Sequence, residues 1–307
     1  MSFFSFGSDP EFMIVKNGQL KNAIDVLPSK EKAIVFENNK FYYDNVLAEI
    51  AVNPSYTKDE AVKNIKNSLA SLAKIIYPMK FKIQAADNYP NEEINCNKAK
   101  IASCIPELGI YSLAIVKPPK SLIEFRDENY YFKSTIRTAG GHIHLGSETL
   151  KNVLDLINVV KMMDLFIGIP SIFLDSGATS KIRRSCYGLA GTHRVPDEIG
   201  RVEYRTLSNF WFSSPDHVEL IYDLCDFVLD FVKQKKHQKF WSVDESKLDE
   251  DPINAHFCYG YDVDALINSI NNCDKIQAAK FMTIVENFVD ENIMNKIEAL
   301  KNVELPD

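Results

Sequence analysis

The sequence predicts an α+β protein, with an antiparallel sheet in its first two thirds and helices after it. Short strand-like runs separated by turn residues follow one another near the start, and one long amphipathic helix interrupts them. Helical spacing dominates after about residue 235. A β-rich fold of 307 residues can form around one core, so we expect residues 1–235 to be the main domain and residues 236–307 a mostly helical extension of it.

Alternation of apolar residues and turn signals locate the strands. Asn38 and Asn39 tolerate the positive φ angles of a tight hairpin and separate two of these strands. The predicted strands are Glu11–Val15, Ala33–Phe36, Phe41–Tyr43, Val46–Val52, Phe81–Gln84, Leu122–Phe125, Gly140–Gly146 and Arg201–Leu207.

Capping signals locate the helices. Thr57 and Glu60 form a capping-box sequence, and apolar residues recur at helical spacing as far as Ile76. A second helix is predicted from about Glu148 to Ile167, and a third from Ser214 to about Val232. The glycine-rich and basic stretch Ser176–Gly200 is predicted to be a long functional loop.

Composition limits the classes of function. The net charge of −7 disfavours nucleic acid as a partner, and the six cysteines form no C-x-x-C pair, which indicates reduced thiols. The first residues lack the basic region of a secretory signal, and we expect no apolar run that is long enough to span a bilayer. These features predict a cytoplasmic protein with no membrane partner.

Two histidines on one strand form the first candidate site. Residues i and i+2 of a strand face the same side, so His142 and His144 should project from one surface of the sheet, between glycines that permit close approach of a ligand. A lone histidine is often a core hydrogen-bonding residue. A pair on one face is better suited to binding a metal or a phosphate.

Acidic residues on separate strands form the second candidate site. Asp9 and Glu11 lie on the first strand, and Glu203 lies beside Arg205 on a late strand. Glu49 lies in an otherwise apolar strand, so its buried carboxylate needs a cation, either an arginine or a metal ion. Several carboxylates with an imidazole on one sheet suit magnesium or manganese.

Arginines form the third candidate site. The planar guanidinium pairs bidentately with phosphate or carboxylate, and clustering of arginines in an acidic protein indicates an anionic ligand. A solvated basic loop is the alternative for Arg183, whereas alternation places Arg205 on the same face as Glu203. The chain has no P-loop, G-x-G-x-x-G or kinase motif, so a nucleotide would be bound through metal and arginines.

These motifs, in this order, resemble the phage-encoded COOH-NH2 ligase type 2 family, a distant relation of glutamate-cysteine ligase and glutamine synthetase. The matching stretches are Gly7–Phe12, Glu49–Pro54, Arg137–Gly146, Arg183–Arg194 and Val202–Trp211. The resemblance covers about residues 5–235 and is densest at Arg137–Gly146. It implies a glutamine-synthetase-like curved antiparallel sheet with flanking helices and a helical C-terminal annex.

The resemblance also implies an ATP- and magnesium- (or manganese-) dependent carboxylate-amine ligase, acting through an acyl phosphate. The expected metal ligands are Glu11, Glu49, His142 and Glu203. The expected catalytic contacts to phosphate or acyl phosphate are Arg137, Arg194 and Arg205, with Arg183, Arg184, Arg201 and His144 binding the nucleotide. The partners would be a small-molecule or peptide carboxylate and an amine, in the host cytoplasm if the protein is phage-encoded, and a homo-oligomer stays open.

One departure from the family lies just before Arg137, where relatives carry a further acidic stretch. Glu124, Asp127 or Glu128 could replace the acid that is missing there. Two other classes of function also stay open. A histidine-carboxylate set could hold zinc in an amide or phosphoester hydrolase, and an inactive phage protein could use the same fold as a binding module.

Overall fold

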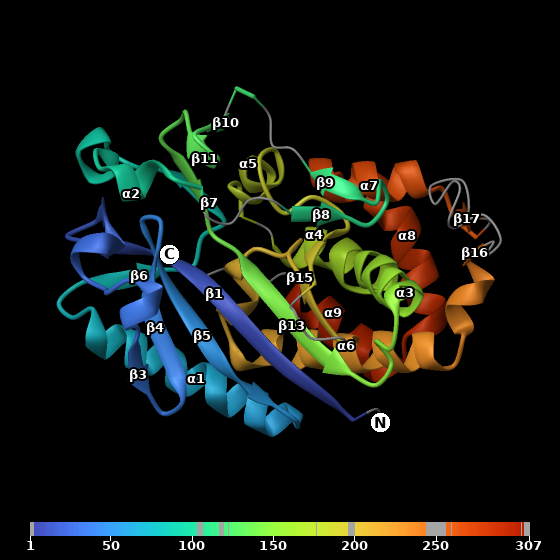
Figure 1. Cartoon of the computed structure of the whole chain (residues 1–307). Helices are drawn as coiled ribbons and strands as arrows, with labels where there is room; N and C mark the ends of the chain where they lie inside the picture. Colours follow the sequence, from blue (N-terminus) through green and yellow to red (C-terminus); the bar gives the residue numbers. More distant parts are fainter. Residues whose placement is uncertain are drawn as a thin grey trace.

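A large antiparallel sheet organises the protein (Figure 1). The computed structural model describes residues 3–102, 107–116, 120–121, 123–175, 177–195, 200–243, 256–258, 260–301 and 303. The sheet has eleven strands, nine of them in the order β3-β4-β5-β1-β13-β15-β14-β8-β9, while β2 and β6 pair with β1 in addition. All of these pairings are antiparallel, which confirms the predicted class of mixed α/β protein with an antiparallel sheet.

Most strands are short, and β1 is the longest. The strands of the large sheet are β1 (Phe4–Lys16), β2 (Gln19–Lys21), β3 (Ile34–Phe36), β4 (Asn39–Asp44), β5 (Leu47–Ser55), β6 (Lys80–Lys82), β8 (Glu107–Gly109), β9 (Ala114–Val116), β13 (Gly141–Ser147), β14 (Thr192–Arg194) and β15 (Arg201–Tyr204). Three two-stranded sheets pair β7 (Ala86–Asn88) with β12 (Ile136–Thr138), β10 (Ile123–Arg126) with β11 (Asn129–Phe132), and β16 (Trp241–Val243) with β17 (His256–Cys258).

The helices lie mainly behind the sheet (Figure 1). They are α1 (Lys58–Ile75), α2 (Asn97–Lys100), α3 (Val153–Met163), α4 (Ile169–Leu174), α5 (Ser180–Arg184), α6 (Pro215–Lys233), α7 (Val263–Asn272), α8 (Lys275–Phe288) and α9 (Glu291–Leu300). Helix α1 packs on β5 and on α6, and α6 packs on α3 and α9. The helices after residue 235 thus join the same core, although the predicted boundary at residue 235 stays a prediction.

The two faces of the sheet differ in chemistry because side chains alternate along each strand. Phe12, Ile143 and Tyr204 are buried on the face that packs against the helices. Ile143 on β13 lies directly opposite Tyr204 on β15, so their neighbours His142, His144 and Glu203 project from the other face. Alternation therefore separates an apolar face from a polar one.

Capping explains where the two longest helices begin. The Thr57 side chain accepts a hydrogen bond from the Glu60 backbone N–H at the start of α1, as the capping-box sequence predicts. Ser214 caps α6 in the same way, with Pro215 in its first turn. Both predicted helices are confirmed to within a few residues.

Three predicted elements need correction. The predicted loop Ser176–Gly200 contains α5 and β14 in its described part; Ser176 and residues 196–199 lie outside the described residues. The predicted helix from Glu148 begins at Val153 and does not end before Pro170. A π-helical turn, Asp164–Gly168, leads directly into α4, and its wider hydrogen bonding accommodates the proline ring. In the predicted strand at 122–125, Leu122 lies outside the described residues and the rest forms β10, in a separate small sheet.

The continuous helical segment Val153–Leu174 is long and apolar enough to cross a membrane by length and composition. The expectation that no such run exists is therefore wrong. The segment is 89% buried inside the protein, however, and its residues belong to the main hydrophobic core. A predominantly apolar helix is typical of the centre of a large core as well as of a membrane.

Candidate functional site

Polar side chains from six neighbouring strands share the face of the sheet that is turned away from the helices. The directly opposed pairs are Tyr42 and Glu49, Glu49 and Glu11, Asp9 and His142, His144 and Glu203, and Glu203 and Arg194. Most of these residues, together with Asp44, Lys30 and Arg205, line a cavity of about 340 Å³. The strand register thus gathers residues that lie far apart in the sequence.

Three carboxylates form the first group in this cavity. Glu11, Glu49 and Asp44 each offer an oxygen within 4.8 Å of the others, and the side chains of Glu11 and Glu49 are buried. The Gly140 backbone N–H donates a hydrogen bond to Glu11 (2.6 Å), and the Tyr42 hydroxyl donates one to Glu49 (2.7 Å). These donors fix the carboxylates in place.

The charges of this group repel one another. Burial, followed by the charge of Asp44, raises the pKa of Glu11 to about 8. The same two causes raise the pKa of Glu49 well above its ordinary value. Buried carboxylates so close together cannot all ionise without a cation, so this group has the properties of a cation site.

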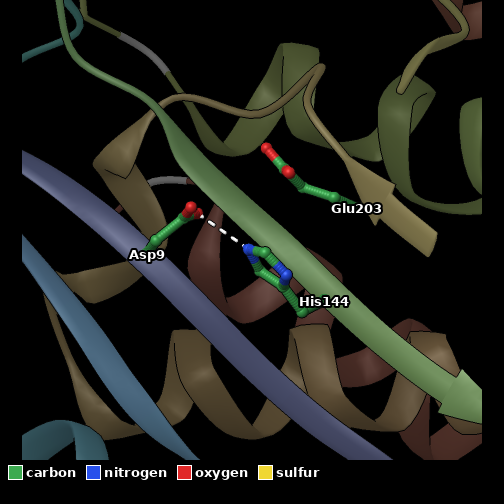
Figure 2. A group of neighbouring side chains, drawn as sticks. All are labelled: Asp9, His144 and Glu203. Atoms are coloured by element: carbon green, nitrogen blue, oxygen red, sulfur yellow. Dashed lines mark ion pairs between the residues drawn. The ribbon is translucent and has the colours of Figure 1, made fainter. Parts of the chain in front are cut away.

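Asp9, His144 and Glu203 form a second group, from β1, β13 and β15 (Figure 2). His144 Nε2 lies 3.1 Å from Asp9 Oδ1, as an ion pair when the ring is protonated. Burial alone would raise the pKa of Asp9, but His144 and His142 outweigh it and hold that pKa well below its usual range. Burial would lower the pKa of His144, but Asp9 raises it overall.

His142 has a different environment from His144, although both rings contact Asp9 from the same face as predicted. Its Nδ1 lies 3.1 Å from Asp9 Oδ1, and its Nε2 lies 3.2 Å from the Tyr187 hydroxyl. Burial, assisted by Arg205, lowers the pKa of His142 to about 3, so the ring is neutral. The metal-ligand role predicted for His142 stays a prediction, and both nitrogens of its ring have protein partners.

Arg205 is fixed in the site by three side chains. Its guanidinium is almost fully buried, pairs with Glu203 and with Glu107 (Nε to Oε1, 3.0 Å), and donates a hydrogen bond to the Tyr187 hydroxyl. The prediction that Arg205 shares a face with Glu203 is confirmed. Arg194 is half-buried and lines the same cavity. Two of the three predicted catalytic arginines therefore lie at the wall of this cavity.

Arg137, the third, lies outside this cavity. Its guanidinium donates hydrogen bonds to Asn45 Oδ1 (2.9 Å) and to the backbone carbonyls of Ser134, Ile136 and Ala99. The densest part of the resemblance therefore includes an arginine that holds backbone segments together. One of those segments contains α2, whose Lys98 lines the cavity.

Arg183 and Arg184 are also turned toward the protein interior. Arg183 is fully buried and donates hydrogen bonds to the carbonyls of Thr206 and Arg205, which supports the segment that carries Arg205. Arg184 donates hydrogen bonds to the Ile270 carbonyl and to Ser171 Oγ. The alternation of side chains along strands could not predict these inward orientations, because both residues lie on the helix α5.

Arg201 lies at the start of β15, opposite Gly146, and lines a separate, mostly apolar cavity of about 790 Å³. The three acids proposed as replacements are not in the site either. Glu124 is exposed on β10. Asp127 and Glu128 form the β10–β11 hairpin turn, with φ angles of 47° and 63°.

Sequence reasoning missed Asp44, Tyr42, Glu107 and Tyr187 as site residues. Asp44 and Tyr42 alternate on β4, next to the strand that carries Glu49, so strand alternation would have indicated them once that pairing was known. Tyr187 lies inside a stretch that carried the resemblance. Glu107 follows residues 103–106, which the structure does not describe, and no sequence signal distinguished it.

Comparison with known proteins supports one family. Residues 119–252 match the model of the phage phiEco32-like COOH-NH2 ligase type 2 family. This range includes His142, His144, Glu203 and Arg205, but not the residues of β1 and β5. None of the curated proteins matches the chain.

Two solved structures are loosely similar. A bifunctional glutathione synthetase from Pasteurella multocida shares 11% identity with this chain, with a TM-score of 0.42. The matched region covers 97% of this chain and 51% of the synthetase. A structure described as apo GmaS without ligand shares 10% identity with this chain, with a TM-score of 0.40. The matched region covers 96% of this chain and 72% of GmaS. The chain thus spans about half the length of that glutathione synthetase. The family resemblance inferred from the sequence is confirmed by this match, in which residues 119–252 are similar to the phage phiEco32-like COOH-NH2 ligase type 2 family.

Proposed function

We propose that this protein is an ATP- and magnesium-dependent carboxylate-amine ligase that forms an amide bond through an acyl phosphate. One observation carries the proposal: two groups of metal-ligating side chains and two arginines converge on one polar face of the sheet. The match to a COOH-NH2 ligase family supports the type of reaction. We further propose a curved sheet of the glutamine-synthetase type, and a cytoplasmic location.

The donor set fits a hard divalent cation. Glu11, Glu49 and Asp44 offer only carboxylate oxygens, which suit Mg²⁺ or Mn²⁺. Asp9, Glu203 and His144 offer two carboxylates and one imidazole, which also suit these ions. A divalent cation bound there would offset the negative charge of the triphosphate and of the attacking and leaving oxygens during phosphoryl transfer.

Arg205 and Arg194 would bind the transferred phosphoryl group. Because Glu203 and Glu107 hold the Arg205 fork on two sides, its orientation is set before any substrate arrives, which is the condition for effective charge stabilisation. Arg194 is more accessible and can follow an anion into the cavity. Lys30 and Lys98 at the cavity wall add further positive charge for an anionic ligand.

The reaction then has two steps. A carboxylate oxygen of the substrate attacks the γ-phosphorus of ATP, and the bond to the ADP oxygen breaks. The amine nitrogen next attacks the acyl carbon, phosphate leaves with the electron pair of the broken C–O bond, and the amine loses a proton. Arg205, which is buried and pre-positioned, and the more accessible Arg194 would stabilise the negative charge that moves between these oxygens.

The test is ADP formation from ATP and Mg²⁺ with a panel of carboxylates and amines, with phosphate and amide products measured in parallel. The proposal predicts ADP release that requires both a carboxylate and an amine, is lost on chelation, and falls at least 100-fold in Glu49→Gln. Glu124→Gln, on the separate β10–β11 sheet, should match the wild type. Amide or phosphoester hydrolysis with zinc and without ATP would refute the ligase and support the hydrolase.

A further inference from the structure

The mostly apolar cavity beside Arg201 lies on the other side of the sheet from the candidate active site. Its walls are the β8–β9 hairpin, the start of α3 and the adjoining ends of β14 and β15 (Figure 1). Leu108 on β8 lies opposite His193 on β14, and His193 lies opposite Tyr204 on the face that packs against the helices. Among the described residues, this cavity shares no lining residue with the cavity of the candidate active site. It is therefore a separate site.

Accessible apolar side chains surround this cavity. Val153 is 71% exposed, Val195 48%, Leu108 39% and Leu113 37%. They are four of the fifteen large apolar side chains that are exposed in the described residues, yet they come from three separate parts of the chain. Single exposed apolar residues are ordinary, but several around one concave site mark a surface that binds a partner. Because these side chains are accessible, a ligand in the cavity can contact them directly.

The size of the cavity suits a small molecule. Its volume of about 790 Å³ falls within the range of pockets that enclose small ligands, about 300–1,000 Å³. Behind the exposed side chains lie Ile110, Leu150 and Ile157, which are almost fully buried and extend the apolar wall inward. An apolar chain bound there would be enclosed on several sides.

The charged groups at the cavity are cations. Lys151 and Arg201 line it, and no acidic residue is among the described residues that do so. Burial lowers the pKa of His193, so this ring adds no charge near neutral pH. The guanidinium of Arg201 has five N–H donors, so it can bind a carboxylate bidentately and still keep a protein partner. A ligand that complements this site must combine an apolar body with a negatively charged end.

We propose that this cavity binds an amphipathic carboxylate, that is, a carboxylic acid with a long apolar chain. The chain lies against Leu108, Leu113, Val153 and Val195, and the carboxylate pairs with Arg201 at the start of β15. This binding site is additional to the proposed ligase centre. It requires neither ATP nor a divalent cation, so it can be tested independently of the ligase reaction.

Calorimetric titration of the full chain with sodium decanoate, below its micelle concentration, tests this proposal. One decanoate should bind per chain. Octanoate lacks two methylene groups and should bind roughly 15-fold more weakly, because burial of each methylene group contributes to affinity. Decyltrimethylammonium has the same apolar chain and the opposite charge, so it should bind at least about tenfold more weakly than decanoate.

Two variants and a matched control locate the binding. Val153→Asp places a carboxylate in the apolar wall and should weaken decanoate binding at least about tenfold. Val153 is the first residue of α3, where an acidic residue suits the helix dipole, so this variant should fold. Ile276→Asp makes the same kind of exchange in the first turn of α8, outside the residues that line the cavity, and should bind decanoate like the wild type. Arg201→Met should weaken decanoate binding about tenfold and abolish the preference over decyltrimethylammonium.

Several results would overturn the proposal. They are no binding of decanoate, binding of several decanoate molecules per chain, equal binding of the two decyl ligands by the wild type, and unchanged binding in Val153→Asp. A dimer in sedimentation that Val153→Asp converts to monomers would also overturn it, because a second copy of the chain would then cover this face. Decanoate binding in a protein that forms no ADP would overturn only the proposed ligase.

Discussion

Replacing Glu11 by Gln should make the metal-free protein more stable at alkaline pH. The pKa of Glu11 is raised from its ordinary 4.5 to about 8, because its carboxylate is buried and lies beside Asp44. Between these two values the folded protein holds a proton that the unfolded chain releases, so rising pH favours unfolding. The destabilisation of the folded protein by Glu11 is absent below about pH 4.5 and complete above about pH 8.

The magnitude follows from the size of the rise. A rise of about 3.5, from 4.5 to about 8, corresponds to roughly 5 kcal/mol of unfolding free energy lost by the wild type as pH increases. Glutamine keeps an oxygen to accept the Gly140 N–H but cannot ionise. The neutral glutamine also removes the repulsion between position 11 and the carboxylates of Glu49 and Asp44, which increases the stability difference from the wild type at alkaline pH.

Urea unfolding at pH 5 and pH 9 in the presence of a chelator measures this contribution. The wild type should lose more stability than Glu11→Gln over that interval, by several kcal/mol, and Glu124→Gln should behave like the wild type. The same pH dependence in Glu11→Gln and the wild type, to within about 1 kcal/mol, would refute the claim that a buried, repelled carboxylate lies at position 11.

Three further predictions concern the residues around the cavity. Tyr187→Phe removes the hydroxyl that contacts His142 and Arg205, so the rate of ADP formation should fall about tenfold at unchanged thermal stability; an unchanged rate would show that the hydroxyl does not position Arg205. Arg205→Lys should lower that rate roughly 100-fold, since lysine cannot span Glu203 and Glu107, whereas Arg201→Lys should change it less than threefold; equal effects in the two variants would contradict the assignment. Arg137→Met removes the hydrogen bonds to Asn45 Oδ1 and to three buried or partly buried backbone carbonyls. It should therefore cost about 3 kcal/mol in chemical denaturation, and a loss below about 1 kcal/mol would contradict the structural role of Arg137.

Local patterns were sufficient to predict much of the fold. The caps at Thr57 and Ser214 and the alternation around Glu49 depend on neighbouring residues alone, so the sequence locates these elements well. Pro170 was misleading, because a proline normally ends a helix but here follows a π turn that only the core packing explains.

The site was predicted less completely because it depends on strand order. Alternation correctly placed His142 with His144, and Glu203 with Arg205, since each pair lies on one segment of chain. Asp44 and Glu107 join the site only through the pairing of β4 with β5 and of β8 with β14, which no local pattern encodes. Arginines could not be sorted into ligand-binding and structural ones, because Arg137 and Arg183 differ from Arg205 only in what surrounds them.

Two groups of side chains should each bind a divalent cation: Glu11 with Asp44 and Glu49, and Asp9 with His144 and Glu203. Anomalous diffraction from crystals soaked in Mn²⁺ and a non-hydrolysable ATP analogue tests it most directly. A manganese peak is expected within about 2.5 Å of carboxylate oxygens in each group, with the triphosphate between the two groups and Arg205. A triphosphate bound elsewhere, or no manganese beside either group, would contradict it.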